Sequence, residues 1–275
     1  MVRRLAQLLD QYGAERPARP RKKGHEESIA QCAASQILGS VSPRGLPTGG
    51  VGNGESVRVG VLPGVYRPRS DTKILARCLR DGSSQDRHVL DLCTGSGALG
   101  VAAALGGARS VTAVDLSRSA VLTARLNARL NDVEMRVLRS DLFGALGDRR
   151  FDLIVSNPPY LPSPDAELPR RGVRRAWEAG PDGRALIDRI LAEAPRHLLP
   201  GGSLLMVHSS VCDTERTVGG LAGQGLKAEV VERHRGPLGP LLAARASELM
   251  RLGLLEEGLR EEEMVVVRGR LPAAG

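Results

Sequence analysis

The sequence predicts an α/β fold with a doubly wound sheet of seven strands and helices on both faces. From His88 onward, short apolar runs alternate with amphipathic helical patterns, which is typical of a sheet covered by helices. A glycine-rich turn directly follows the first run, at the place where such sheets bind ligands. The predicted strands cover residues 88–93, 111–115, 134–138, 152–156, 203–208, 227–233 and 264–268.

Two helices connect strands in this prediction. The first covers 117–131, where apolar residues recur among Arg and Asn and Ser117 stands in the N-cap position. The second covers 184–198, and the turn Pro200-Gly201-Gly202 after it leads into the fifth strand.

The segment 236–263 is unusually long for a connection between two strands. We predict one or two helices in it, because its apolar residues share a helical stripe. The stripe either packs against the sheet or caps a substrate cleft or partner site. Its members are Leu241, Leu242, Ala244, Leu249, Leu252 and Leu255.

A basic N-terminal extension precedes the folded domain. The chain has 275 residues and a net charge of +8. Residues 1–60 hold nine Lys/Arg against five Asp/Glu, and the remainder holds 30 against 26, so about half of the excess lies in the extension. Residues 1–57 are rich in Arg, Gly and Pro, which predicts a mostly disordered extension, whereas 58–275 form the folded domain. The charge fits contact with RNA or the ribosome, or simply an Arg-rich composition.

The cysteines and the apolar runs indicate the compartment. Cys32, Cys78, Cys93 and Cys212 form no C-x-x-C pair, which indicates neither a zinc site nor a disulfide framework. No window approaches the length of a membrane span. We therefore expect a cytoplasmic protein without a metal or a membrane anchor.

The glycine-rich turn at 91–97 predicts a nucleotide site. Gly95 and Gly97 permit a tight turn whose backbone N–H groups approach a ligand. Asp115 ends the second strand, where its carboxylate can accept both ribose hydroxyls of an adenosine. With Gly100 the pattern also matches the dinucleotide fingerprint. This region alone therefore does not distinguish a nicotinamide dinucleotide from S-adenosylmethionine.

Asp141 follows the third strand, at the position expected to face an adenine amino group. Leu142 and Phe143 then supply an apolar wall. The alternative is that Asp141 only caps a surface helix.

The most specific motif is Asn157-Pro158-Pro159-Tyr160, which follows the fourth strand without a break. The two prolines fix their own φ and constrain the residue before them, so Asn157 is held at the carboxyl edge of the sheet. The Asn157 side-chain oxygen and the Pro158 carbonyl can accept two N–H bonds from one planar NH2 group, while Tyr160 offers a stacking face. This geometry selects an amide or exocyclic amine and aims its lone pair at a sulfonium methyl. A rigid loop or a proline-rich ligand motif is the alternative.

These motifs, in this order, resemble the class I, Rossmann-like methyltransferases of the HemK/PrmC family, which use S-adenosylmethionine (SAM). Residues 65–72 and 178–187 are also similar to family segments, and the resemblance spans about 64–236. Members methylate the glutamine of the Gly-Gly-Gln loop in translation release factors. The resemblance implies that the catalytic residues are Asn157, Pro158 and Tyr160, with Pro159 completing the substrate site. It implies SAM contacts from Thr72, Asp91, Thr94, Gly95, Gly97, Asp115, Leu116, Asp141, Leu142 and Asn157.

The chain departs from the family pattern in three places. Cys93 replaces the glycine that usually opens the turn. Residues 1–57 look unfit to form the N-terminal helical domain of the bacterial members, and 236–263 exceeds the compact family core. In this the chain resembles the shorter HemK-like branch, in which a small partner subunit assists.

Four functions remain open at this stage. The leading one is methylation of a protein glutamine amide, with a release factor as the expected substrate. The second is methylation of an adenine or cytosine amino group in DNA or RNA, since Tyr160 also suits a flipped base and the basic arm suits nucleic acid. The third is a small-molecule methyltransferase with 236–263 as a lid. The fourth is a non-catalytic binding module, against which the intact Asp115 and Asn157 speak.

Overall fold

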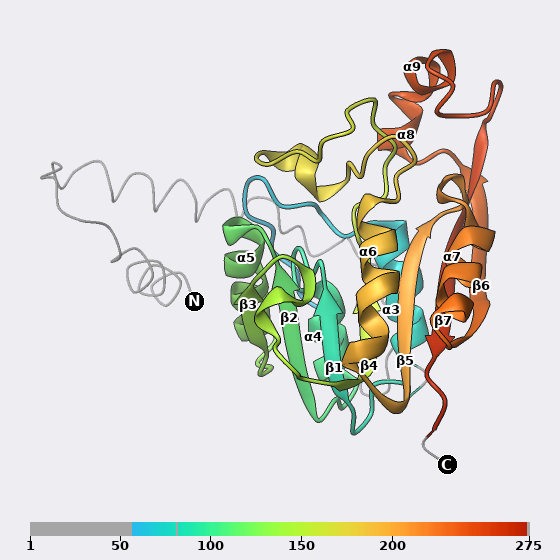
Figure 1. Cartoon of the computed structure of the whole chain (residues 1–275). Helices are drawn as coiled ribbons and strands as arrows, with labels where there is room; N and C mark the ends of the chain where they lie inside the picture. The colour runs from blue at the N-terminus through green and yellow to red at the C-terminus, as the bar shows by residue number, and fades with distance from the viewer. Residues whose placement is uncertain (1–56, 81, 274–275) are drawn as a thin grey trace, which may run out of the picture. The chain divides into compact units, whose positions relative to one another are not determined.

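The computed structural model describes residues 57–80 and 82–273, so the predicted disordered extension lies almost entirely outside the described residues. These residues form one seven-stranded sheet in the order β3-β2-β1-β4-β5-β7-β6 (Figure 1). β1 to β5 run parallel, whereas β7 is antiparallel to both β5 and β6. The order reverses beside β1, between β1 and β4, which is the point at which doubly wound sheets bind ligands.

All seven predicted strands are present, so the predicted fold class is confirmed. The first five strands are β1 (His88–Leu92), β2 (Ser110–Asp115), β3 (Arg136–Arg139), β4 (Phe151–Ser156) and β5 (Leu198–Ser209). The last two, β6 (Lys227–Pro237) and β7 (Glu261–Arg270), are longer than predicted because they continue as a hairpin beyond the body of the sheet.

β5 begins earlier than the sequence predicts. Pro200-Gly201-Gly202 is not a turn before the strand, since it forms an irregularity inside it, where the register against β4 shifts between Phe151 and Leu153. Gly201 has φ +78, and a residue in this left-handed region explains why the sequence pattern there looks like a turn.

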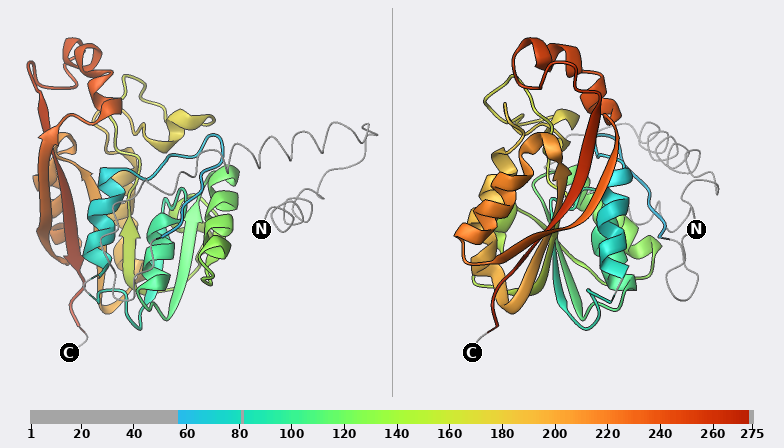
Figure 2. Two further views of the ribbon diagram at one scale, coloured as in Figure 1. Left: turned by 180° about the vertical axis from the view of Figure 1, so that it is seen from behind. Right: turned by 90° about the vertical axis from the view of Figure 1, so that its right-hand side faces the viewer.

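The helices cover both faces of the sheet (Figure 2). One face carries α3 (Ser70–Arg80), α4 (Ala98–Leu105) and α5 (Arg118–Leu130), and the other carries α6 (Ala185–Glu193) and α7 (Thr214–Gly223). α5 begins as predicted, with the Ser117 hydroxyl accepting a bond from Ala120 N. α6 is shorter than predicted, because its last turn tightens into the 3-10 helix Ala194–His197 around Pro195.

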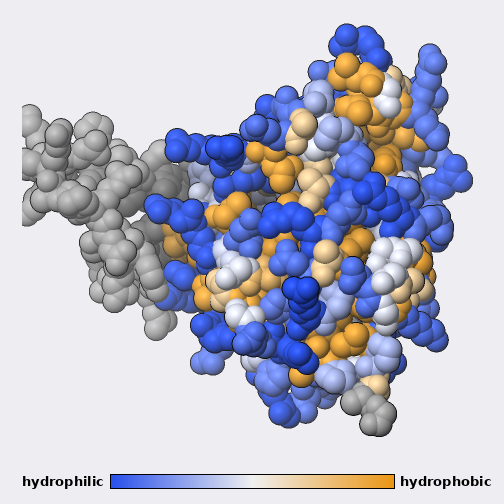
Figure 3. Space-filling view, viewed as in Figure 1, coloured by the Kyte–Doolittle hydropathy of each residue, from blue (hydrophilic) through white to orange (hydrophobic). Residues whose placement is uncertain are grey.

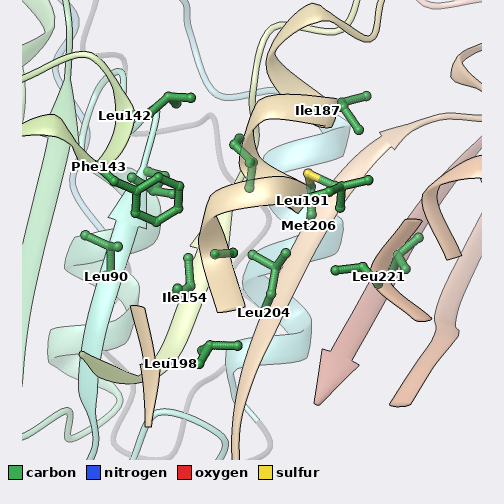
Figure 4. Close-up of a cluster of buried hydrophobic side chains, with 14 of the residues drawn as sticks. Leu90, Leu142, Phe143, Ile154, Ile187, Leu191, Leu198, Leu204, Met206 and Leu221 are labelled. Carbon is green, nitrogen blue, oxygen red and sulfur yellow. The ribbon is translucent and has the colours of Figure 1, made fainter. Parts of the chain in front are cut away.

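The alternation of side chains along the strands divides the core into two layers. Leu90, Ile154 and Leu204 point toward α6 and α7, where they pack with Ile187 and Leu191 (Figure 4). The side chains between them point the other way, and Val89, Leu153 and Leu205 pack with helix α3. Both layers hold the strands rigidly, so the loops at their carboxyl ends are mounted on a fixed base.

Segment 236–263 contains two short helices, α8 (Pro240–Ala243) and α9 (Ala246–Arg251), between the ends of β6 and β7. Its buried residues Leu242, Leu249 and Leu255 pack with Leu161 and Trp177, not with the faces of the sheet. Leu252, from the predicted stripe, is 46% exposed. Figure 3 shows apolar side chains gathered near the top of the view, over α8 and α9. None of the helices in the described part of the chain has the length and apolar character needed to cross a membrane.

Candidate active site

Two neighbouring cavities open at the carboxyl edge of the sheet and share a wall. The first, of about 270 Å³, lies against the glycine-rich turn, and we call it the inner cavity. The second, of about 420 Å³, lies between Asn157–Tyr160 and α8, and we call it the outer cavity. Tyr66, Asn157, Pro159 and Ala176 line both. A ligand in one cavity therefore meets a ligand in the other at Asn157.

The glycine-rich turn and Asp115 form the floor of the inner cavity. Gly95 has φ +53 and donates its N–H to Asp115 Oδ2 over 2.9 Å, while Ser117 N donates to Asp115 Oδ1 over 2.8 Å. Each carboxylate oxygen keeps a further lone pair for a ligand hydroxyl. Burial raises the pKa of Asp115, although these two backbone bonds oppose the rise.

Gly97 packs against helix α5, behind the inner cavity. It does not line the inner cavity, and a Cβ added to it would lie 2.9 Å from Ala124 Cα. Its φ is +81. The glycine therefore lets the turn pack closely against helix α5.

Asp91 also lies behind the cavity wall. It is fully buried, and its Oδ2 accepts bonds from Thr94 Oγ1 over 2.5 Å and Gly100 N over 2.9 Å, which hold the turn closed. Within the described residues, no donor reaches its Oδ1. Burial raises the pKa of Asp91 to about 7. Such a buried carboxylate oxygen is unusual in a folded protein.

Strained backbone lies at the same cavity. Cys93 has φ +57 and Leu142 has φ +43, and both line the cavity. Side chains in this left-handed region cost about 1–2 kcal/mol, and such strain gathers at functional sites. Cys93 therefore adopts the backbone conformation that glycine usually supplies. Asp141 makes no helix-cap bond and instead pairs with Arg189 over 3.0 Å at the cavity rim.

The segment before α3 closes the inner cavity from above. Asn127, on α5, bonds both the N–H and the carbonyl of Gly60 over 2.8 Å and also bonds the Ser96 carbonyl. These bonds tie the segment to the glycine-rich turn. Val65, Tyr66 and Thr72 consequently line the cavity.

Thr72 sets the orientation of the Asn157 side chain. Thr72 Oγ1 donates weakly to Asp71 Oδ1 over 3.4 Å and accepts a bond from Asn157 Nδ2 over 3.1 Å. Because the amide nitrogen of Asn157 is held in this way, its Oδ1 is presented as an acceptor. Asn157 itself is fixed from below, since Ser156 donates to the Leu92 carbonyl inside the sheet.

Tyr160 is held by a carboxylate. Its hydroxyl donates to Asp71 Oδ2 over 3.0 Å, and Asp71 is 4% exposed. Burial, together with Asp71, raises the pKa of Tyr160 well above its usual range, so the phenol stays protonated and keeps this bond. Burial and Asp71 likewise raise the pKa of Tyr66 to about 12. The Tyr66 ring also packs near the Trp177 ring, with 6.2 Å between the ring centroids.

A buried network supports Asn157–Tyr160 from behind. Cys212 Sγ donates to the Tyr160 carbonyl over 3.0 Å, and a Cβ on Gly183 would lie only 2.3 Å from that oxygen. Arg184 is 1% exposed and donates to the carbonyls of Cys212 and Asp213, to Thr217 Oγ1 and to Asp188. The guanidinium thus locks the support to α6 and α7.

A loop after Tyr160 covers the inner cavity. Leu161 N donates to the Trp177 carbonyl over 2.6 Å and Ala179 N donates to the Leu161 carbonyl over 3.0 Å, which closes the base of the loop. Leu168, Arg170 and Arg175, inside the loop, line the cavity. The covering position of this loop was not predicted from the sequence.

The structure brings most of the predicted residues together. Inner-cavity residues include Thr72, Thr94, Gly95, Asp115, Leu116, Asp141, Leu142 and Asn157, whereas Gly97 and Asp91 stand behind its wall. Pro158, Pro159 and Tyr160 line the outer cavity with Asn157. No role was predicted for Tyr66, Asp71, Trp177 and Arg184. The first two and Arg184 lie within the family-like segments 65–72 and 178–187, and Trp177 directly precedes the second.

Comparison with known proteins supports the same class. The model of the "Methyltransferase small domain" family matches residues 57–169. A solved complex of Mtq2 with Trm112 from E. cuniculi has a TM-score of 0.54 at 20% identity and covers 76% of this chain and 99% of that one. The ribosomal protein L11 methylase of Lactobacillus delbrueckii has a TM-score of 0.51 at 21% identity, with 78% and 85% covered. At these identities the likeness concerns the fold.

Curated relatives are more similar. The Methanocaldococcus jannaschii protein named "Putative protein N5-glutamine methyltransferase MJ0928" is 34% identical over 195 residues, 71% of this chain and 98% of the relative. The release factor glutamine methyltransferase of Bordetella pertussis is 38% identical, with 69% and 72% covered. A ribosomal protein uL3 glutamine methyltransferase from Bradyrhizobium diazoefficiens is 42% identical over a shorter stretch, 47% of this chain and 43% of that protein.

The sheet order and the paired cavities define a class I SAM-dependent methyltransferase. Within that class, the chain belongs to the HemK/PrmC family of protein glutamine methyltransferases. The resemblance of the sequence motifs to this family is confirmed.

Proposed function

We propose that this enzyme transfers a methyl group from SAM to the side-chain amide nitrogen of a glutamine in a translation release factor. The curated relatives are named for a protein glutamine, for release factors and for a ribosomal protein, which supports a glutamine in a protein as the acceptor. The observation that carries the proposal is the Asn157 amide, which Thr72 holds at the wall between the two cavities.

The inner cavity suits SAM. Asp115 offers carboxylate oxygens for the ribose hydroxyls, and Asp141 with Leu142 stands where the adenine would lie. Asp91, behind the wall, supports this site by holding the glycine-rich turn through Thr94 and Gly100. When bound, SAM supplies a methyl group made electrophilic by its sulfonium.

The outer cavity suits the glutamine. Asn157 Oδ1 and the Pro158 carbonyl accept the two N–H bonds of one amide, while Tyr160, fixed by Asp71, gives the amide plane a surface to lie on. Oriented in this way, the nitrogen lone pair faces the inner cavity. As that nitrogen forms its bond to the methyl carbon, the sulfonium S–C bond would break and S-adenosylhomocysteine would leave. Both acceptor oxygens would stabilise the positive charge that the nitrogen gains, and its surplus proton would then pass to water.

Partner and compartment are part of this proposal. The E. cuniculi protein with the same fold was solved as a complex with Trm112, which supports an assisting small subunit here too. An enzyme that acts on translation factors works in the cytoplasm, where ribosomal RNA lies near.

An Asn157→Ala variant tests the acceptor site. Loss of one preorganised acceptor of this kind costs about 10²-fold in kcat. We expect that loss with labelled SAM and purified release factor, supplied with Trm112-type subunit if needed, while the Kd for SAM changes little. Asn131→Ala is the matched control, because this asparagine bonds Arg58 and lines neither cavity. Equal kcat values for Asn157→Ala and Asn131→Ala would disprove the assignment.

A further inference from the structure

The segment between β6 and β7 stands over the outer cavity. Pro237 of β6 pairs with Glu261 of β7, so residues 238–260 are inserted into a β-hairpin that is already closed by that pair. We call residues 238–260 the cap. An ordinary hairpin needs only a two-residue turn at this place, so the sheet itself does not require the cap.

Two carboxylates from different elements hold the cap. Glu262, on β7, accepts a bond from Gly239 N over 2.6 Å at the start of α8. Glu178, at the end of the covering loop, pairs with Arg245 over 2.7 Å. The Glu178 side chain is 2% exposed and that of Arg245 is 22% exposed, so water screens this ion pair little. The cap is thereby fixed to the element that follows Tyr160.

The inner side of the cap forms a wall of the outer cavity. Leu238, Leu241 and Leu242 line the cavity, as does Trp177 of the covering loop. Asp71 and Glu262 supply carboxylates to the same cavity, and Arg69 and His234 supply basic side chains, so its lining has no single sign of charge. Its volume, about 420 Å³, lies in the range of sites for whole small ligands, so it exceeds what one amide group fills.

We propose that the cap is the specificity-determining wall for the peptide that carries the acceptor glutamine. The residues flanking the glutamine pack between Trp177 and the leucines of α8, with neutral or apolar side chains beside the glutamine. An acidic neighbour is rejected, because Trp177 and the leucines of the cap would desolvate its carboxylate. This inference rests on the proposed function, since Asn157–Tyr160 define the same cavity as the glutamine site.

A charge placed in the wall tests the proposal. In Leu241→Asp, we expect the KM for the release factor to rise at least about tenfold, the factor that ~1.4 kcal/mol of lost binding produces. The Kd for SAM should stay within twofold of wild type, since Leu241 does not line the inner cavity. Leu252→Asp is the matched control, because Leu252 belongs to the cap but is 46% exposed and does not line the outer cavity. Its KM should match that of wild type.

Two further measurements separate specificity from a disturbed fold. Replacing 238–260 by Asn-Gly should leave SAM binding intact and remove the preference between glutamine peptides with glycine or aspartate beside the glutamine. The wild-type enzyme should prefer the glycine peptide. An unchanged KM in Leu241→Asp, or an unchanged preference without the cap, would overturn the proposal. Wild-type enzyme that methylates no glutamine acceptor would instead overturn the proposed function, on which the cap depends.

Discussion

Gly183→Ala should slow methyl transfer without weakening SAM binding. The added Cβ would lie 2.3 Å from the Tyr160 carbonyl oxygen and 2.9 Å from Cys212 Sγ. Contacts below 3.0 Å do not persist, so the Tyr160 carbonyl must move by about 0.7 Å, the difference between 3.0 Å and 2.3 Å. A misplacement of about 1 Å in a reacting geometry costs about 10²-fold. We therefore expect kcat to fall by one to two orders of magnitude.

The assay compares kcat, the Kd for SAM and the melting temperature. Alanine at the observed φ of +70 adds about 1–2 kcal/mol of backbone strain, so the variant should also melt earlier. Gly201→Ala measures the cost of backbone strain alone, because Gly201 has φ +78 and nothing lies within 4 Å of its added Cβ. A folded Gly183→Ala enzyme with wild-type kcat would refute the claim that this support positions Tyr160.

Three further predictions concern the inner cavity. Asp115→Ala should raise the Kd for SAM about 10²-fold while kcat at saturation changes little, because two bonds to a charged acceptor are lost; an unchanged Kd by calorimetry would contradict the ribose assignment. Thr72→Val should lower kcat up to about tenfold by releasing Asn157 Nδ2, whereas Thr72→Ser, which keeps the hydroxyl, should retain most activity. The pKa of Asp91 is raised to about 7 in the folded enzyme, against ~3.9 in the unfolded chain. Its contribution to the stability of the fold is therefore fully present below pH ~3.9 and is lost as the pH rises through about 7. In chemical denaturation without SAM, wild type should therefore lose stability relative to Asp91→Asn between about pH 4 and 7, and a constant difference would show that Asp91 does not titrate there.

His208 gives the opposite trend in the same interval. Burial lowers the pKa of His208 to about 4, so the stability due to its neutral form is present above ~6.5 and is lost as the pH falls through about 4. The pH dependence of the stability of the wild type alone would contain the opposing effects of Asp91 and His208. The difference between wild type and Asp91→Asn isolates the carboxyl.

The fold and the main site were accessible from the sequence because they depend on local patterns. Apolar runs ending in a polar residue predicted β1, β2 and β4, and the residues at those ends, Asp115 and Asn157, lie at the predicted edge. In parallel strands, this edge collects the carboxyl ends automatically. Local pattern therefore placed residues that are far apart in the chain.

What the sequence could not show depends on packing between distant segments. Gly97 belongs to the ligand motif, yet its close contact is with Ala124 of another helix. Asp71 and Thr72 lie 89 and 85 residues from Tyr160 and Asn157, and no spacing rule connects them. The packing of the cap could not be predicted for the same reason. Its helical stripe indicates an apolar partner, but the stripe fits the face of the sheet as well as it fits Leu161 and Trp177.

Tandem mass spectrometry of a release factor, after incubation with the enzyme and labelled SAM, is the most direct test of the proposed glutamine methylation. We expect one labelled methyl group on the side-chain nitrogen of a single glutamine, appearing about 10²-fold more slowly when Asn157→Ala replaces the wild type. Label on an amino group of nucleic acid, with the release factor unlabelled, would contradict it.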